Sequence, residues 1–133
     1  KGKNTFIFID EIYLLFQHEY SANFLFTLWK RVRKYGAYAT GITQNVDDLL
    51  QSHTARTMLA NSEFIIMLNQ ASTDRIELAK LLNISDLQMG YITNVEAGHG
   101  LIKVGSSLVP FENKFPRNTK LYKLMTTKPG EGD

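Results

Sequence analysis

Short apolar runs separated by polar residues predict the strands of an α/β sheet. The first run, residues 5–9, is apolar at almost every position, which is typical of a central parallel strand covered by helices on both faces. The runs at 37–43 and 63–69 are bounded by polar residues and predict two further strands. Over residues 21–35, apolar positions recur every three or four residues, which predicts a helix that ends at Gly36.

Strands and helices alternate along the first half of the chain. Residues 47–52 and 54–61 predict two short helices before the third strand, and this order is typical of a parallel sheet with right-handed crossovers. We therefore predict an α/β fold with three layers and a mainly parallel sheet. Because an apolar strand of this kind usually lies in the middle of a sheet, we also expect the chain to be part of a longer polypeptide.

The second half of the chain predicts a pair of helices. Residues 72–82 have the pattern of an amphipathic helix. Ser85, with Gln88 three positions later, is a capping-box signature for a second helix that runs to about Thr93. The two helices are therefore joined by a tight connection.

A hairpin is predicted over residues 98–111, with its turn at residues 105–106. We place it at the edge of a sheet, because Pro110 has no N–H to donate to a neighbouring strand. Residues 1–127 are then expected to form one domain or a large piece of one, and residues 128–133 a disordered tail.

The helix pair and the hairpin also allow an alternative, a helix-turn-helix with a wing that binds DNA. The predicted second helix, residues 86–93, contains no Lys or Arg and offers only Gln88 and Asn94 for contacts with base edges. A DNA-binding module or a non-catalytic interaction domain is therefore kept as the second interpretation.

Composition narrows the class of protein. A chain of 133 residues with 44% hydrophobic and 21% charged residues is typical of a globular domain. The absence of cysteine excludes a disulfide framework and a thiolate zinc site, and a net charge of +2 is too small to indicate nucleic-acid binding. His18, His53 and His99 do not have the spacing of metal ligands. No apolar run approaches the roughly 20 residues needed to cross a bilayer, and the first residues do not follow the order of a signal peptide.

Two adjacent carboxylates follow the first strand. Asp10 and Glu11 come directly after residues 5–9, at the end of the strand where α/β sheets bind ligands. An Asp there can hold the water shell of a Mg²⁺ ion bound to a triphosphate, and the next Glu can deprotonate an attacking water. The alternative is that both acids only stabilise the start of a helix near Ile12.

A glutamine follows the second strand at the same predicted edge of the sheet. Gln44 comes one helix and one strand after Glu11, so the crossover should return it to the neighbourhood of the two acids. A glutamine side chain there can hydrogen-bond the attacking water or a γ-phosphate oxygen. The alternative is a polar residue that only begins a loop.

A family resemblance rests on segments spread along most of the chain: FIFIDEIYLLF, LWKRVRKYG, TGITQNVDDLL, ANSEFIIMLNQ, GLIKVG and VPFENKFP. Together they resemble the type IV secretion ATPases of conjugation systems, the VirB-four family, which is related to the HerA and FtsK motors. The resemblance implies a RecA-like P-loop NTPase domain that binds ATP and Mg²⁺ and powers assembly of a secretion channel and transfer of substrate. It implies that Asp10 and Glu11 are the Walker B acids, with Asp10 holding the metal through water, and that Gln44 is the glutamine sensor.

One motif of that family is missing from the chain. No segment has the phosphate-loop form G-x-x-x-x-G-K-[ST], and the glycines at 98, 100 and 105 belong to the predicted hairpin. In the family this loop precedes the strand that carries the acids, so the resemblance implies that residues 1–127 are the carboxyl-terminal portion of the RecA-like ATPase domain and begin after the Walker A strand. We expect the isolated chain to fold, to remain largely monomeric, and to be unable to hydrolyse ATP or to bind it tightly.

The resemblance also implies partners and a location for the full-length protein: a ring of identical subunits, components of a secretion channel, and the cytoplasmic face of the cell membrane. Contact with DNA is compatible with it. In such rings an Arg stabilises charge on the neighbouring subunit's γ-phosphate, and Arg33 is the first candidate for this catalytic role, ahead of Arg56 and Arg75. The basic run at residues 30–34 also fits a solvated helix end, where positive charge is favoured.

Overall fold

A computed structural model describes residues 2–130, which form two small sheets with helices along one side. The strands and helices alternate through the first half of the chain, as predicted. In chain order the elements are β1 (Thr5–Ile9), η1 (Ile12–Phe16), α1 (Glu19–Arg31), η2 (Val32–Tyr35), β2 (Ala37–Gly41), α2 (Val46–Gln51), α3 (His53–Ala60), β3 (Phe64–Met67), α4 (Ser72–Leu82), α5 (Asp86–Met89), η3 (Gly90–Ile92), β4 (His99–Val104), β5 (Ser107–Glu112) and α6 (Lys120–Met125).

The first sheet consists of β1 and β2, which are parallel and pair from Thr5 with Ala37 to Ile9 with Gly41. The helix between them ends as predicted, because Gly36 adopts a left-handed φ of 65° that terminates η2 and turns the chain into β2. Because the two strands are parallel, their carboxyl ends lie at the same edge of the sheet.

The second sheet corrects the prediction for residues 63–69. β3 was expected to extend the parallel sheet, but it pairs with β4 in antiparallel orientation, and β4 pairs with β5 in the order β3-β4-β5. Among the described residues, β2 and β3 have no ladder between them, so each has one neighbour only. The apolar pattern identified the strand correctly, but the hairpin supplies its partner.

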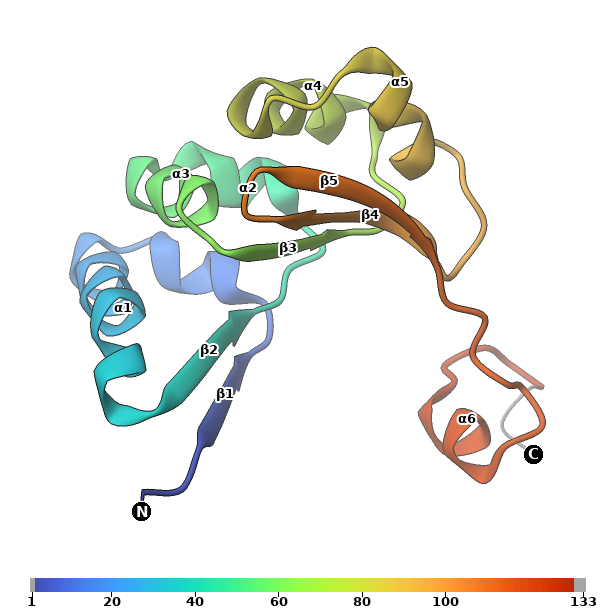
Figure 1. Ribbon diagram of the computed structural model, residues 1–133, viewed down its shortest axis with the longest axis horizontal. Helices are drawn as coiled ribbons and strands as arrows, with labels where there is room; N and C mark the ends of the chain where they lie inside the picture. The colour runs from blue at the N-terminus through green and yellow to red at the C-terminus, as the bar shows by residue number, and fades with distance from the viewer. Residues whose placement is uncertain (1, 131–133) are drawn as a thin grey trace.

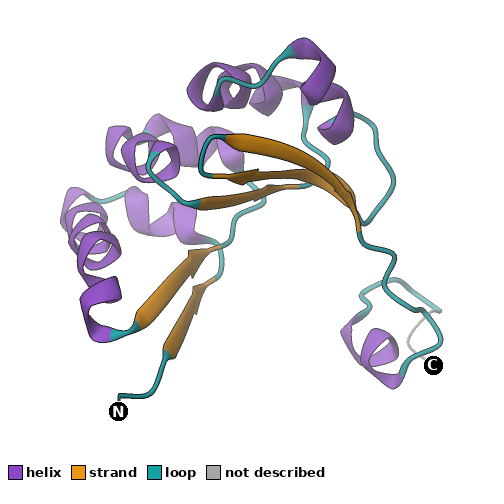
Figure 2. Cartoon of the chain, viewed as in Figure 1, coloured by secondary structure: helices purple, strands orange, loops and turns teal. Residues whose placement is uncertain are grey.

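Helices cover one side of the strands, and the other side is open (Figures 1 and 2). In β1 the side chains of Phe6 and Phe8 are 63% and 68% exposed, so the expected cover on both faces of this strand is absent within residues 2–130. Phe6 stacks on Tyr38 of β2, with ring centroids 5.2 Å apart. The described chain therefore forms two layers, and the predicted three-layer arrangement is not present within it.

The predicted hairpin is confirmed. β4 and β5 pair around the turn at residues 105–106, and Pro110 lies on β5, the edge strand of its sheet. The capping box is also confirmed, because the Gln88 N–H donates to the Ser85 Oγ atom and the Ser85 N–H donates to the Gln88 Oε1 atom.

The alternative of a winged helix-turn-helix fits this structure poorly. The helix that would read DNA, α5, has only four residues before the 3-10 turn η3. The hairpin that would be the wing is paired with β3 and so belongs to a sheet.

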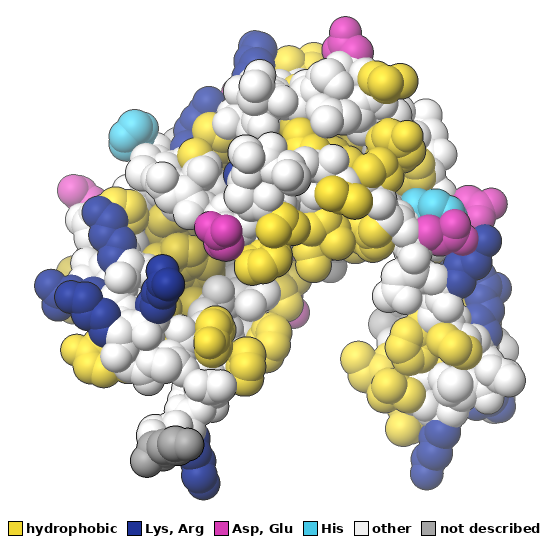
Figure 3. All heavy atoms as spheres, in the orientation of Figure 1, with side chains coloured by type: hydrophobic (Ala, Val, Ile, Leu, Met, Phe, Trp, Pro, Cys, Tyr) yellow, Lys and Arg dark blue, Asp and Glu magenta, His cyan; other side chains and the backbone are white. Residues whose placement is uncertain are grey.

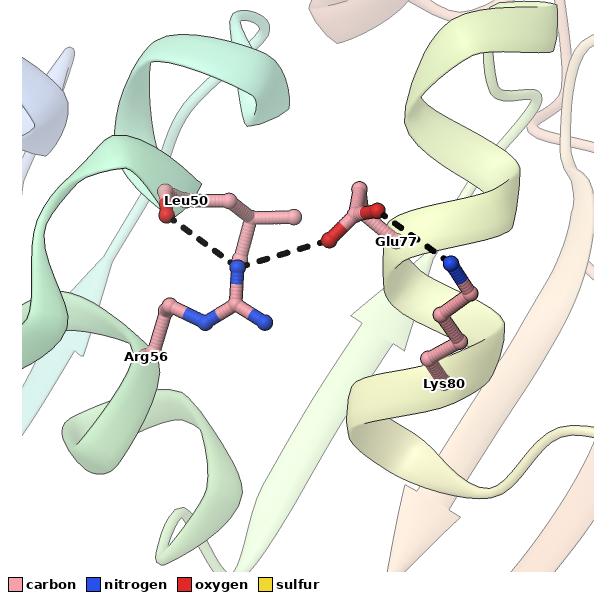
Figure 4. Close-up of polar contacts among 4 residues, drawn as sticks. All are labelled: Leu50, Arg56, Glu77 and Lys80. Atoms are coloured by element: carbon pink, nitrogen blue, oxygen red, sulfur yellow. Dashed lines mark hydrogen bonds and ion pairs between the residues drawn. The ribbon is translucent and has the colours of Figure 1, made fainter.

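Two hydrophobic clusters hold the helices to the strands. One lies between the second sheet and helices α2 and α4 and includes the fully buried Ile92 and Leu101, and the other lies between η1, α1 and α3 and includes Ile12 and Leu25. Helix α2 contributes to both clusters. The clusters are also joined by a polar contact, in which Arg56 of α3 lies 3.4 Å from both the Leu50 carbonyl and the carboxylate of Glu77 on α4 (Figure 4).

Helix α6 lies apart from both sheets (Figure 1). Leu121, Leu124 and Met125 on this helix are exposed, and Figure 3 shows hydrophobic side chains both here and over the open side of the strands. Residues 128–130 of the expected disordered tail form no helix or strand, and residues 131–133 lie outside the described part of the chain. Within residues 2–130, no helix has the length and apolar character needed to cross a membrane.

Candidate hydrolytic site

The carboxyl edge of the first sheet carries the two predicted acids. Asp10 and Glu11 follow β1 directly, and residues 42–45 follow β2 at the same edge. Asp10 is exposed and Glu11 is half-buried. The Asp10 Oδ1 atom accepts a hydrogen bond of 3.0 Å from the Glu11 N–H, which ties the two residues together.

The backbone at this edge contains one extra residue. In a regular parallel ladder, Ile42 would donate to the carbonyl of Ile9 and accept from the N–H of Glu11. Ile42 does donate to Ile9 at 2.9 Å, but its carbonyl accepts from the N–H of Ile12, also at 2.9 Å. One residue too many therefore lies between the two ladder bonds, as in a β-bulge, and bulges of this kind reorient side chains next to functional sites.

Glu11 absorbs the extra residue by adopting a left-handed conformation, with φ 48° and ψ 46°. This region is uncommon for a non-glycine residue and costs free energy on the order of 1 kcal/mol. The conformation is held because the residues on both sides of the bulge are bonded to Ile42. The Glu11 side chain therefore leaves the chain at a bulge, whereas a regular strand would have placed it on one face of the sheet.

Gln44 lies on the exposed loop that leads from β2 into α2. The loop is ordered by its neighbours: the Thr43 Oγ1 atom accepts from the Asn45 N–H at 3.2 Å, and Asn45 caps α2 by accepting from the Asp48 N–H. The structure therefore brings Gln44 to the same edge as Asp10 and Glu11. This is the arrangement that the crossover in the sequence predicted.

The three candidate arginines lie elsewhere. Arg33 is on η2, which precedes β2, so it lies at the opposite, amino-terminal edge of the first sheet. Arg56 is engaged with Leu50 and Glu77, and Arg75 is half-buried on α4. Arg33 therefore does not share the edge that carries Asp10 and Glu11.

An open depression of about 480 Å³ lies beside the start of α1 and the junction of α2 and α3. Asp48 and Glu19 are among its lining residues, but Asp10, Glu11 and Gln44 are not. Among residues 2–130, no three His, Cys, Asp or Glu side chains are grouped so that they could hold a metal ion by themselves. The candidate site is therefore the exposed strand edge, and the depression is separate from it.

Sequence reasoning missed the residues that shape this edge. Ile12 and Ile42 form the ladder bonds around the bulge, and the absence of a side chain at Gly41, the last residue of β2, leaves room for Ile12. The available signal was a glycine at the end of the second predicted strand, because glycine in a strand often marks a place where another part of the chain lies close to the backbone.

Comparison with known proteins gives an independent result. The TraG P-loop domain family matches residues 1–101. Among solved structures, VirB4 of Thermoanaerobacter pseudethanolicus is similar, with a TM-score of 0.79 and 26% sequence identity over 86% of this chain. The chain spans 32% of the length of that VirB4 chain. A search of curated proteins finds no match.

These findings agree with the family resemblance in the sequence and with an α/β fold. The family match covers three quarters of the chain, including both strands of the first sheet and the whole candidate edge. The chain belongs to the TraG P-loop domain family.

Proposed function

We propose that this chain is part of an ATP-hydrolysing motor for type IV secretion or conjugative transfer, and that it supplies the acids and the glutamine of the hydrolytic site. The observation that carries the proposal is the bulge at the carboxyl edge of β1, which presents Asp10 and Glu11 beside the loop of Gln44. The family match and the similarity to VirB4 support it.

The residues at the edge have the chemistry that ATP and Mg²⁺ require. Asp10 is exposed and can accept hydrogen bonds from water bound to a metal, and carboxylate oxygens suit Mg²⁺. A bound magnesium ion would neutralise charge on the phosphates. Because the described residues offer no group of three metal-binding side chains, the ion's remaining ligands would be water and phosphate oxygens.

Glu11 and Gln44 are assigned to the attacking water. Glu11 would accept a proton from that water, as a general base, and the bulge sets the direction in which its side chain leaves the backbone. Gln44 would orient the water or contact the γ-phosphate through its side-chain amide. Both roles need the reacting phosphate to be held at this edge by other groups.

The remainder of the polypeptide is proposed to supply the phosphate loop. β2 has one paired edge and one edge without a ladder partner among the described residues. A parallel strand added there would end beside residues 43–44, so a loop that follows it would lie next to Gln44 and the acids. Such an addition, with its helix on the open face, would also cover Phe6 and Phe8 and complete a third layer.

Arg33 is proposed to act on a neighbouring subunit. It lies at the edge of the first sheet opposite Asp10 and Glu11, so it would not contact a phosphate bound at the site of the same chain. It would reach a phosphate only across an interface in a ring. The same proposal includes contacts with secretion-channel components at the cytoplasmic face of the membrane, with DNA as a further partner.

The proposal is tested by Glu11→Gln in the full-length protein. The substitution keeps the size and hydrogen-bonding capacity of the side chain but removes the base, so ATP binding should persist while hydrolysis falls by roughly 10²-fold or more. Asp10→Asn should also weaken the dependence of ATP binding on Mg²⁺.

Asp47→Asn is the matched control, since Asp47 is an exposed carboxylate in the first turn of α2, near the same edge, with no assigned role. Steady-state hydrolysis and calorimetric titration of ATP separate rate from binding. Parental turnover by the Glu11→Gln protein would show that the base has been assigned wrongly.

A further inference from the structure

Gly41 lies against the residue that closes the bulge. A Cβ atom built on Gly41 would be 2.6 Å from the Ile12 Cδ1 atom and 3.3 Å from its Cγ2 atom, where ordinary contact begins at 3.4 Å. Gly41 does not adopt a left-handed φ, so its backbone conformation is open to other residues. An alanine at this position would clash with Ile12, although its backbone conformation would be allowed.

Ile12 has little freedom to move away. Its side chain is 5% exposed and packs in the cluster that includes Phe16 and Leu25. Its N–H donates to the Ile42 carbonyl at 2.9 Å, which fixes its backbone to the strand that Gly41 ends. Rotating Cδ1 away would leave the Cγ2 atom at 3.3 Å, so Ile12 itself would have to shift, and the shift would reach its neighbour in the chain, Glu11.

We propose that Gly41 is a positioning residue of the hydrolytic site. The missing side chain lets Ile12 pack against the end of β2, and this packing together with the Ile42 bond holds Glu11 in its left-handed conformation. The inference rests on the proposed function, because it takes Glu11 as the base. It adds a residue that acts on the direction of that carboxylate without touching the substrate.

The test compares Gly41→Ala with the double variant Gly41→Ala/Ile12→Val in the full-length protein. Valine keeps the β-branch but lacks Cδ1, the atom that the new methyl group would meet first. Gly41→Ala should lower kcat by about 10- to 100-fold with unchanged ATP affinity, as expected for a misplaced catalytic group. The double variant should recover most of the rate. Gly90→Ala is the control, because a Cβ atom there has nothing within 4 Å.

A second measurement does not depend on activity. Amide hydrogen exchange of Ile12, followed by NMR in the 133-residue protein, reports the bond to the Ile42 carbonyl. Exchange should be faster in Gly41→Ala, return toward the parental rate in the double variant, and be unchanged in Gly90→Ala.

Parental kcat and parental exchange in Gly41→Ala would overturn the inference, and so would a loss of rate that Ile12→Val does not restore. If Gly41→Ala does not fold, Ile12→Ala takes its place, since it removes the packing without a clash: reduced kcat with intact ATP binding supports the inference, and parental kcat contradicts it. Glu11→Gln in the same assay distinguishes a failure of the positioning role of Gly41 from a failure of the proposed function. If Glu11→Gln is inactive and Gly41→Ala is not impaired, only the positioning role fails; if Glu11→Gln is fully active, the proposed function fails.

Discussion

The sheet of β1 and β2 buries much less of its strands than the sheet of β3, β4 and β5. None of the residues in β1 or β2 is buried, whereas Ile65, Met67 and Leu101 in the second sheet are 8%, 3% and 0% exposed. Both sheets have helices on one side (Figure 1). The first sheet carries the candidate site, and the second sheet carries a core of its own.

This difference indicates how the site is held. The first sheet depends on its backbone ladder and on Ile12, which enters the helical cluster immediately after the strand. The strands themselves therefore contribute little burial to stability, while their ends are fixed in register. In this part of the molecule the helices supply most of the buried surface, and the paired strands fix the positions of the residues that follow them.

The largest effect on stability should come from the second sheet. Leu101→Ala removes a side chain with no exposed surface, so the free energy of unfolding should fall by about 3 kcal/mol or more. Phe8→Ala, at 68% exposure in the first sheet, should cost much less. Urea denaturation followed by circular dichroism measures both, and equal losses would contradict the contrast between the two sheets.

A smaller effect is expected at the junction between the two regions. The Ser52 Oγ atom accepts from the Ala55 N–H at 3.2 Å and caps α3, so Ser52→Ala should cost about 1 kcal/mol. The fluorescence of Trp29, the single tryptophan, reports the cluster between η1, α1 and α3 beside the first sheet, and circular dichroism reports the whole chain. Coincident shifts of both transitions indicate that the regions unfold together, and a shift in fluorescence alone indicates that they do not.

The smallest effect should be a pH dependence at the edge strand β5. The hydrogen bond and charge of Lys114 hold the pKa of Glu112 below its usual value of 4.5, with a minor contribution from His99. A lowered pKa means that the ionised group stabilises the fold above the unfolded pKa, and that this is lost as pH falls through the folded pKa. Because Glu112 is exposed, the gain is small.

Glu112→Gln should therefore be slightly less stable than the parent at neutral pH, and the difference should shrink below pH 4.5. Thermal melts across that range, at low salt, measure it. If the stability difference between the parent and Glu112→Gln grew on acidification, the ionised Glu112 would not be stabilised by Lys114.

Local signals in the sequence predicted local structure well. The helix over 72–82, the capping box of Ser85 and Gln88, and the hairpin turn at 105–106 are all present, because each depends on residues close together in the chain. The parallel pairing of the first two strands followed from the helix between them. These features need no knowledge of distant contacts.

Pairing between segments that are distant in the sequence was harder to predict. The run around Phe64 and Ile66 reads as a buried parallel strand, yet both side chains are more than 60% exposed, and the strand pairs with β4. An apolar run predicts a strand that can be buried, but it does not identify the strand that pairs with it or the element that covers it. The bulge at Glu11 is hidden for a similar reason, since it depends on the register between Ile12 and Ile42.

The left-handed backbone of Glu11 has a consequence for how this sequence can drift over generations. Asparagine occupies that conformation at lower cost than glutamate, so, on the proposed role of Glu11 as the base, a chain that no longer needed this role would gain stability from Asn at position 11. Persistence of glutamate at this position in descendants would then mark selection for activity against the preference of the backbone. Its replacement by Asn or Gly would mark a lineage in which the domain is retained for binding or assembly alone.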